Sequence, residues 1–172
     1  MGSILMRILL FLSSYFPLTV IFFIQLFPEQ KAMAFIMVGI GILGLLGMII
    51  YVRTVKSLAS IPLTVTSISR KGSETMSYIF SYLLPFMAVP WDKPKEALSL
   101  GIIFGVLGII YINSNMIHVN PMLYAFGYKL YEIENENGEV FSLLTRGRVC
   151  KRQRLSVVKV GEEILIDTGA ES

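Results

Sequence analysis

The chain has 172 residues, of which 54% are hydrophobic and 16% are charged, and its formal net charge is +3. Soluble domains average roughly 45–50% apolar and about 25% charged residues, so the composition argues against an ordinary soluble domain and predicts a membrane protein. The single cysteine, Cys150, excludes an internal disulfide, and one cysteine with one histidine cannot build a four-ligand zinc site.

Two long apolar stretches open the chain. Residues 8–27 form the first predicted transmembrane span, and residues 32–52 form the second, which Arg53 closes. Each is close to the roughly 20 residues that cross a 30 Å hydrocarbon core. Pro17 is expected to bend the first span or to leave a carbonyl for a neighbouring hydroxyl.

Residues 76–91 and 97–119 form the third and fourth predicted spans. The third is the weakest, and a re-entrant or surface helix is its alternative. Basic residues collect in cytoplasmic loops, and they are concentrated in the link 53–75 and in the C-terminal tail. Both regions can share one side only if residues 76–91 cross the membrane. We therefore expect residues 1–119 to form a four-helix transmembrane bundle with both termini in the cytoplasm.

One face of the third predicted span is polar. Tyr78, Ser81, Tyr82 and Pro85 fall at helical spacing, so this face is expected to contact protein rather than lipid. A hydrogen-bonded seam between helices is the preferred interpretation, and a water-lined or ligand-sensing groove is the alternative.

Glycines recur in two predicted spans. The segment GIGILG at residues 39–44 matches the dinucleotide-binding fingerprint, but no strand precedes it and it lies inside an apolar helix. Small residues at this spacing instead favour close helix packing, within one subunit or between subunits. The predicted packing positions are Gly39, Gly41, Gly44, Gly47, Gly101, Gly105 and Gly108.

No Asp, Glu, Lys, Arg or His lies in the apolar centre of any predicted span, which argues against a pump or a secondary transporter. Where residues 97–119 end, Asn113, Asn115, His118 and Asn120 form a polar cluster. We expect its amides to bond unpaired backbone carbonyls at the helix end. The lone histidine has no nucleophile or triad partner, so no catalytic site is predicted.

Residues 120–172 are predicted to form a small antiparallel β domain in the cytoplasm. Asn137–Gly138 is a strong hairpin signal between strands at 128–134 and 140–145. A second pair, 155–160 and 164–168, surrounds Gly161, and residues 63–69 could add a fifth strand.

The segment between the two predicted hairpins is strongly basic. Five cations fall within nine residues, and they are Arg146, Arg148, Lys151, Arg152 and Arg154. Anionic lipid and a protein partner are equally good ligands for such a run near a membrane. No aromatic residue interleaves it, so direct contact with nucleic acid is not expected.

Several short motifs of the C-terminal 100 residues resemble the KwaA family, the membrane subunit of the Kiwa anti-phage system. They are YIFSYLLPF at 78–86, Asn113-Ser-Asn115, Asn120–Pro121, Gly127-Tyr128-x-x-Tyr131-Glu132 and Arg146-Gly-Arg148. The resemblance implies a homo-oligomeric sensor in the bacterial inner membrane. It also implies a cytoplasmic effector partner, KwaB, which acts on nucleic acid when phage attack perturbs the envelope.

The sequence therefore predicts a membrane sensor and scaffold that recruits a cytoplasmic effector in phage defence. No enzyme activity, cofactor or metal is expected. The alternative is a small oligomeric pore-forming or membrane-permeabilising effector built from the same helices.

Overall fold

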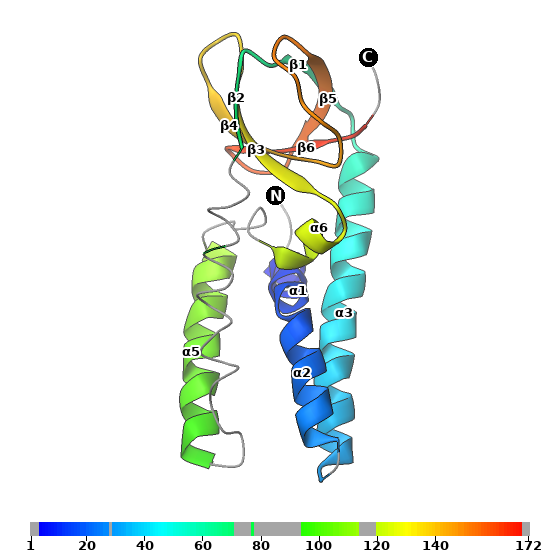
Figure 1. Ribbon diagram of the computed structural model, residues 1–172, viewed down its shortest axis with the longest axis vertical. Helices are drawn as coiled ribbons and strands as arrows, with labels where there is room; N and C mark the ends of the chain where they lie inside the picture. Colours follow the sequence, from blue (N-terminus) through cyan, green and yellow to red (C-terminus); the bar gives the residue numbers. More distant parts are fainter. Residues whose placement is uncertain (1–3, 28, 71–76, 78–93, 114–119, 170–172) are drawn as a thin grey trace.

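The computed structural model describes residues 4–27, 29–70, 77, 94–113 and 120–169. Within these ranges the chain forms a stem of helices that carries a curled sheet at one end (Figure 1). The helices are α1 (Ile4–Ser14), α2 (Phe16–Leu26), α3 (Lys31–Lys56), α5 (Pro94–Asn113) and α6 (Pro121–Ala125). The strands are β1 (Ile61–Thr64), β2 (Ser67–Arg70), β3 (Lys129–Glu134), β4 (Val140–Thr145), β5 (Arg154–Lys159) and β6 (Ile164–Asp167).

The first predicted span is broken into two helices. α1 and α2 have 11 residues each and meet at an angle of 57° around Tyr15. Pro17 lies in the first turn of α2, where its missing N–H is tolerated but cannot extend the ladder of α1. The expected bend at Pro17 is confirmed. Each helix alone is only about 16 Å long at 1.5 Å per residue.

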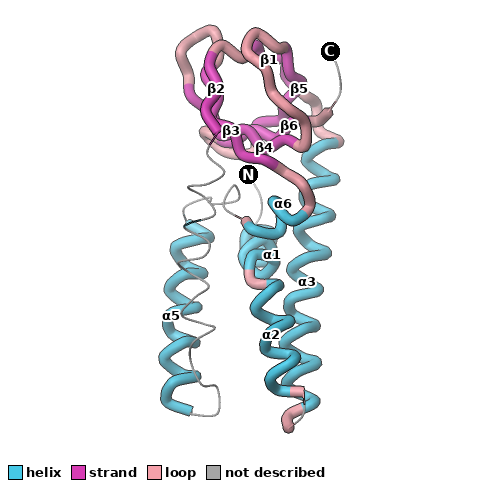
Figure 2. Tube along the Cα trace, viewed as in Figure 1, coloured by secondary structure: helices cyan, strands magenta, loops and turns pink. Residues whose placement is uncertain are grey.

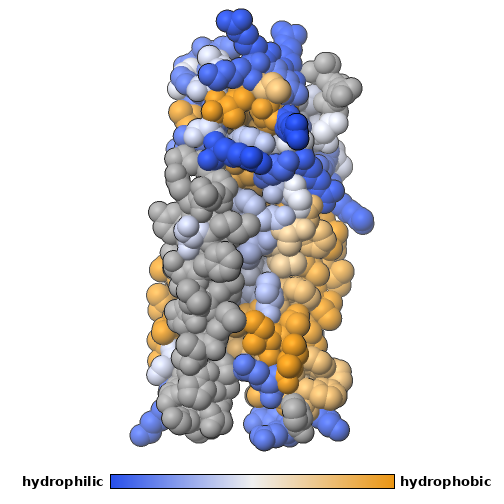
Figure 3. Space-filling view, viewed as in Figure 1, coloured by the Kyte–Doolittle hydropathy of each residue, from blue (hydrophilic) through white to orange (hydrophobic). Residues whose placement is uncertain are grey.

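α3 is the principal apolar helix of the described chain. It has 26 residues, and by length and composition alone it is the one described helix that could cross a membrane. α1 and α2 would make a second span if the bent pair is counted as one, while the apolar segment Gly101–Asn113 of α5 is shorter than a span. Much of the stem surface that is not hidden by grey atoms is apolar, while hydrophilic residues predominate around the sheet and at the opposite tip (Figure 3).

The predicted four-helix transmembrane bundle is therefore wrong. The first predicted span is interrupted at Tyr15, and the apolar part of α5 measures only about 20 Å at 1.5 Å per residue. The third predicted span, residues 76–91, lies outside the described residues apart from Ser77. The number of spans was overestimated because a count of apolar residues does not detect a break in a helix.

Three of the predicted packing glycines lie on the face of α3 that meets α1 and α2. A Cβ atom at Gly44 would lie 2.7 Å from the backbone nitrogen of Ser13, and one at Gly47 would lie 2.8 Å from the Cβ of Leu9. At Gly41 the added atom would overlap the hydroxyl of Thr19. These helices can approach so closely only because the three positions carry no side chain.

The other four predicted packing glycines have looser surroundings than Gly41, Gly44 and Gly47. A Cβ atom at Gly108 would lie 3.2 Å from the ring of Phe11, a side chain on α1. No described residue lies within 4 Å of a Cβ atom built at Gly39, Gly101 or Gly105. Aromatic stacking completes the contact of α5 with α1, since the rings of Phe11 and Phe104 are 4.9 Å apart.

The sheet has the order β1-β5-β6-β4-β3-β2. The expectation of a purely antiparallel domain is wrong, because β4 and β6 pair in parallel while the other neighbours are antiparallel. The segment expected to add a fifth strand forms two strands, β1 and β2, one at each edge. Val65 and Thr66 join them, and their N–H groups donate to the carbonyls of Gln153 and Glu134. The sheet is thereby curled into an incomplete barrel (Figure 2).

Both predicted hairpins are present. β3 and β4 pair around a turn in which Gly138 has a φ of +79°, and β5 pairs with β6. In β3 and β4, successive residues alternate between the two faces of the sheet. Leu130, Leu144, Ile166 and Val158 align in one row across four strands and face the helices. Leu143 and Leu165 lie in the second core, inside the curl.

The close contact at Gly44 generates a matched test on one helix. Gly44→Ala is expected to lower the thermal unfolding midpoint of the full-length protein in mild detergent, because backbone atoms of α1 cannot move aside, and overpacking costs about 1–3 kcal/mol. Gly39→Ala makes the same change where no described residue is near, and it is expected to leave the midpoint unchanged or raised. Equal midpoints for the two variants would contradict the packing seen at Gly44.

Candidate functional site at the helix–sheet junction

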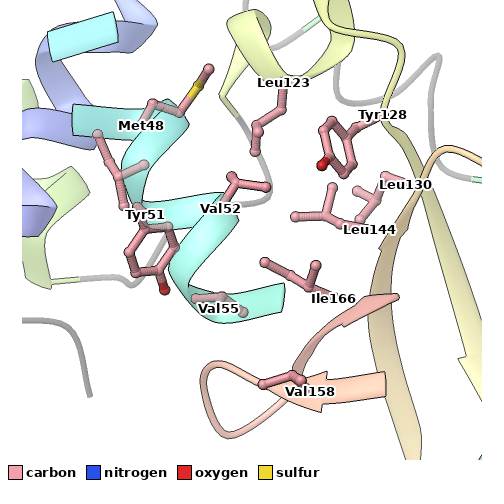
Figure 4. Packing of buried hydrophobic residues seen from close by; sticks show 11 residues of the cluster. Met48, Tyr51, Val52, Val55, Leu123, Tyr128, Leu130, Leu144, Val158 and Ile166 are labelled. Atoms are coloured by element: carbon pink, nitrogen blue, oxygen red, sulfur yellow. The ribbon is translucent and has the colours of Figure 1, made fainter. Parts of the chain in front are cut away.

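The end of α3 is packed directly against the sheet. Met48, Val52 and Val55 are buried beside Leu144 and Ile166, so the stem and the sheet share one hydrophobic cluster (Figure 4). Only residues 57–60 separate α3 from β1. The backbone of the last turns of α3 is therefore held close to the sheet.

A buried polar contact ties α6 to the bend between α1 and α2. Asn120, which is 0% exposed, caps α6 by accepting a hydrogen bond from the N–H of Met122 at 2.9 Å. Its amide donates to the Leu10 carbonyl at 3.1 Å and to the Ser13 hydroxyl at 2.6 Å. The expected bonding of amides to unpaired carbonyls at the end of residues 97–119 stays a prediction, because the carbonyl that Asn120 bonds belongs to Leu10 of α1 and also accepts from the Ser13 and Ser14 hydroxyls. Asn115 and His118 lie outside the described residues.

Arg7 makes a second polar link, which the sequence analysis missed. Its guanidinium donates to the Ile112 carbonyl at 2.9 Å, near the C-terminal end of α5. A cation is favourable at that end of a helix, where the last carbonyls have no partner within the helix. The sequence feature that could have indicated this link is the position of Arg7, a single cation directly before the first apolar stretch.

A pocket of about 300 Å³ opens where α3, α6 and the end of β4 meet, and we call it the junction pocket. Its apolar wall and its polar rim come from segments far apart in the sequence. The lining residues are Met48, Ile49, Val52, Arg53, Lys56, Leu123, Phe126, Tyr128 and Arg146.

Three cations surround the junction pocket. Lys56 Nζ lies 5.4 Å from the centre of the Tyr128 ring, and the Arg146 guanidinium lies 4.6 Å from the same centre. Both distances are within the range of cation–π attraction. Within the described part of the chain, no carboxylate forms an ion pair with Arg53, Lys56 or Arg146. The rim of the pocket is therefore positive and suited to an anion.

The basic run predicted as one surface is divided by the fold. Arg146 lines the junction pocket, whereas Arg154 lines a second pocket, of about 520 Å³, between β1 and the turn that joins β3 to β4. These two pockets lie at opposite ends of β4. Arg148, Lys151 and Arg152 are exposed on the loop between β4 and β5, and we call these three the loop cations.

The other predicted positions are not brought to this pocket. Tyr78, Ser81, Tyr82 and Pro85 lie outside the described residues. Among the residues that are described, no group of three His, Cys, Asp or Glu side chains could hold a metal ion. In the sequence, Arg53 and Lys56 served only to predict topology. In the structure they share a pocket with Tyr128 and Arg146, which lie 72 or more residues further along the chain.

The fold and its pocket define a class of small protein in which an apolar helical stem carries a curled β domain with a basic junction. A sequence model described as anti-phage protein KwaA matches residues 6–166, so the chain belongs to the KwaA family of anti-phage proteins. The resemblance inferred from short motifs is thus confirmed.

One curated relative illustrates the relationship. The Kiwa protein KwaA of Escherichia coli O55:H7 (strain RM12579 / EPEC) is 29% identical over 69 residues. The match covers 40% of this chain and 35% of that protein, so it spans about a third of the relative's length. No solved structure matches the chain significantly.

The contact of Asn120 generates the second prediction. Asn120→Ser keeps an oxygen that can cap α6 but removes both donors to α1, so thermal stability should fall by about 2 kcal/mol, two buried hydrogen bonds at about 1 kcal/mol each. Ser99→Ala removes an exposed bond to the Lys95 carbonyl and should change stability by no more than about 0.5 kcal/mol. Thermal unfolding of the detergent-solubilised protein measures both. A parent-like Asn120→Ser protein would show that α6 is held by packing alone.

Proposed function

We propose that this KwaA family protein is a non-catalytic subunit of the bacterial inner membrane that senses phage attack and holds a cytoplasmic effector through its β domain. The observation that carries the proposal is the family match over residues 6–166, joined to a stem whose large apolar side chains face outward. Two kinds of structural feature support the proposal: one concerns location in the membrane, and the other concerns binding of the effector.

The outward faces of α3 and α5 support membrane location. Only 28% of the most apolar window of α3 is buried, whereas the core helix of a soluble protein would be mostly buried. A contiguous apolar surface of this kind in water is unfavourable and marks contact with lipid or with another subunit. The exposed residues are Met33, Phe35, Ile36, Ile40, Ile42, Leu43, Leu46 and Ile50 on α3, and Leu98, Ile102, Ile103, Val106, Ile109 and Ile110 on α5.

The distribution of charge supports a cytoplasmic sheet. Three cations of the junction pocket (Arg53, Lys56 and Arg146) and the three loop cations lie at the sheet end of the stem. At the other end, the α2–α3 turn carries one acidic residue, Glu29, and one basic residue, Lys31. Cytoplasmic segments next to a membrane are enriched in Lys and Arg. The N-terminal end of α1 and the C-terminal end of β6 both lie toward the sheet end (Figure 1), so both would be cytoplasmic if the sheet is.

A partner would meet the β domain rather than the stem. The loop cations extend from the surface between β4 and β5 without a described carboxylate partner, so an acidic surface on an effector could bind them. The family resemblance suggests a KwaB-like effector as that partner. Assembly of several copies is part of the same proposal, because Gly101 and Gly105 are exposed on the apolar face of α5.

The pore-forming alternative has less support. A water-filled pore needs polar groups directed at its lumen. In the described helices, the buried polar side chains Ser13, Ser14 and Asn120 instead bond to backbone carbonyls or to each other. We therefore prefer the scaffold.

Sidedness can be tested with the natural cysteine. Cys150 is exposed on the β domain and is the only cysteine of the chain. A membrane-impermeant maleimide should leave it unlabelled in intact cells and label it in inverted inner-membrane vesicles. In a Cys150→Ser background, Gln30→Cys at the opposite end of the stem should show the reverse pattern. Labelling of Cys150 in intact cells would exclude a cytoplasmic β domain.

Recruitment can be tested by reversing the loop cations. Replacing Arg148, Lys151 and Arg152 with Glu should abolish co-purification of the effector encoded beside the gene and cancel protection against phage, because the contact becomes repulsive. Membrane extraction and thermal stability should match the parent, since all three side chains are exposed. The control reverses Arg70 of β2 and Lys159 of β5, two exposed cations away from the loop between β4 and β5, and it should keep the effector. Retention of the effector by the triple variant would remove the loop cations from the interface.

A further inference from the structure

We infer that the junction pocket binds the phosphate of an anionic phospholipid of the cytoplasmic leaflet. The inference rests on the proposed membrane location, and it goes beyond it by naming a ligand class and the residues that hold it. Arg53, Lys56 and Arg146 would contact the phosphate, with the Tyr128 ring fixing two of them.

The first argument is the unbalanced charge of the pocket. The two ring distances place Lys56 Nζ and the Arg146 guanidinium no more than about 10 Å apart, which is about one Debye length at 0.1 M salt. Arg53 lines the same pocket, and no described carboxylate pairs with any of the three. Like charges at this spacing repel, and a bound anion would convert the repulsion into attraction.

The second argument is the apolar wall. Met48, Ile49, Leu123 and Phe126 line the same pocket, and Phe126 is 39% exposed. Met48 and Leu123 are buried, so Ile49 and Phe126 form the accessible part of the wall. A free phosphate ion would leave these two side chains against water, whereas a lipid would cover them with the glycerol backbone and the first acyl carbons. The combination of a cationic rim and an apolar wall therefore selects an amphiphilic anion.

The third argument is depth. The uncharged stretch of α3 before Arg53, residues 32–52, has 21 residues and a length of about 31 Å at 1.5 Å per residue. That length equals the roughly 30 Å hydrocarbon core, so Arg53 and Lys56 emerge at the headgroup level. Arg146 reaches the same pocket from the sheet. A bound phosphate would therefore bridge α3 to β4 and fix the sheet against the leaflet.

The test measures lipid binding by the full-length protein in an uncharged detergent. Added phosphatidylglycerol should raise the thermal unfolding midpoint in a saturable way, whereas phosphatidylcholine and inorganic phosphate at matched concentrations should not. Equal stabilisation by phosphatidylcholine would overturn the role of headgroup charge. Equal stabilisation by inorganic phosphate would overturn the lipid assignment, and no response to phosphatidylglycerol would overturn the inference entirely.

Matched variants locate the effect. Lys56→Gln with Arg146→Gln should weaken the apparent affinity for phosphatidylglycerol by roughly 30-fold, because each cation near a lipid surface contributes about fivefold. Arg148→Gln with Lys151→Gln removes the same charges outside the pocket and should keep the parent affinity. The single variant Arg146→Gln, exposed at the rim, gives about a fivefold loss if the double variant does not fold. Equal affinities for the pocket and control variants would assign binding to general surface charge.

Failure of this inference is distinguishable from failure of the proposed function. The lipid measurement is made in detergent and does not depend on sidedness or on an effector. If Cys150 labelling places the sheet in the cytoplasm while phosphatidylglycerol has no effect, the membrane location stands and the lipid site is withdrawn. If the protein is released from membranes by alkaline carbonate, the proposed location fails independently of the pocket variants.

Discussion

Burial of the last turns of α3 against the sheet is the constraint on which the remaining features depend. Met48, Val52 and Val55 contact a row of aliphatic side chains that crosses four strands, so the sheet has no freedom to turn about the helix axis. Because Arg53 and Lys56 lie on the same turns, the hydrophobic contact also places Lys56 over the Tyr128 ring and brings Arg53 to the same pocket. The apolar core thereby determines the position of the basic pocket, although no ion pair in the described residues helps to hold it.

The broken helix at Tyr15 is held by polar contacts within an apolar environment. The Leu10 carbonyl accepts hydrogen bonds from the hydroxyls of Ser13 and Ser14 and from the amide of Asn120. An unpaired carbonyl is costly where water is excluded, so these donors favour one bend over other arrangements of the same helices. Since Asn120 also caps α6, the bend in the stem and the entry into the β domain are connected by a single side chain.

Short sequence motifs correctly predicted the turns and the bend, which depend on only a few neighbouring residues. The hairpin at Asn137–Gly138, the second hairpin around Gly161 and the bend at Pro17 each follow from a few adjacent residues, and each is present. The separation of β1 from β2 and the parallel pairing of β4 with β6 depend on contacts between distant segments, which no local pattern encodes. The junction pocket belongs to the second kind, because residues 48–56 meet residues 123–146 only in the folded chain. The number of spans was overestimated since hydropathy measures composition and not continuity.

The division of the basic run has its own physical cause at the end of β4. The Thr145 hydroxyl, which is buried, donates to the Asp167 carboxylate at 2.5 Å and accepts a bond from the N–H of Gly147 at 3.0 Å. These bonds tie the ends of β4 and β6 together and turn the chain immediately after Arg146. Arg146 is thus retained over Tyr128, while Arg148 continues into the exposed loop. A run that is uniform in charge is thereby divided among separate surfaces: Arg146 lines the junction pocket, Arg154 lines the second pocket, and the loop cations are exposed between β4 and β5. Charge density along the sequence therefore identifies the cations that are available, but the strand end decides what each of them can bind.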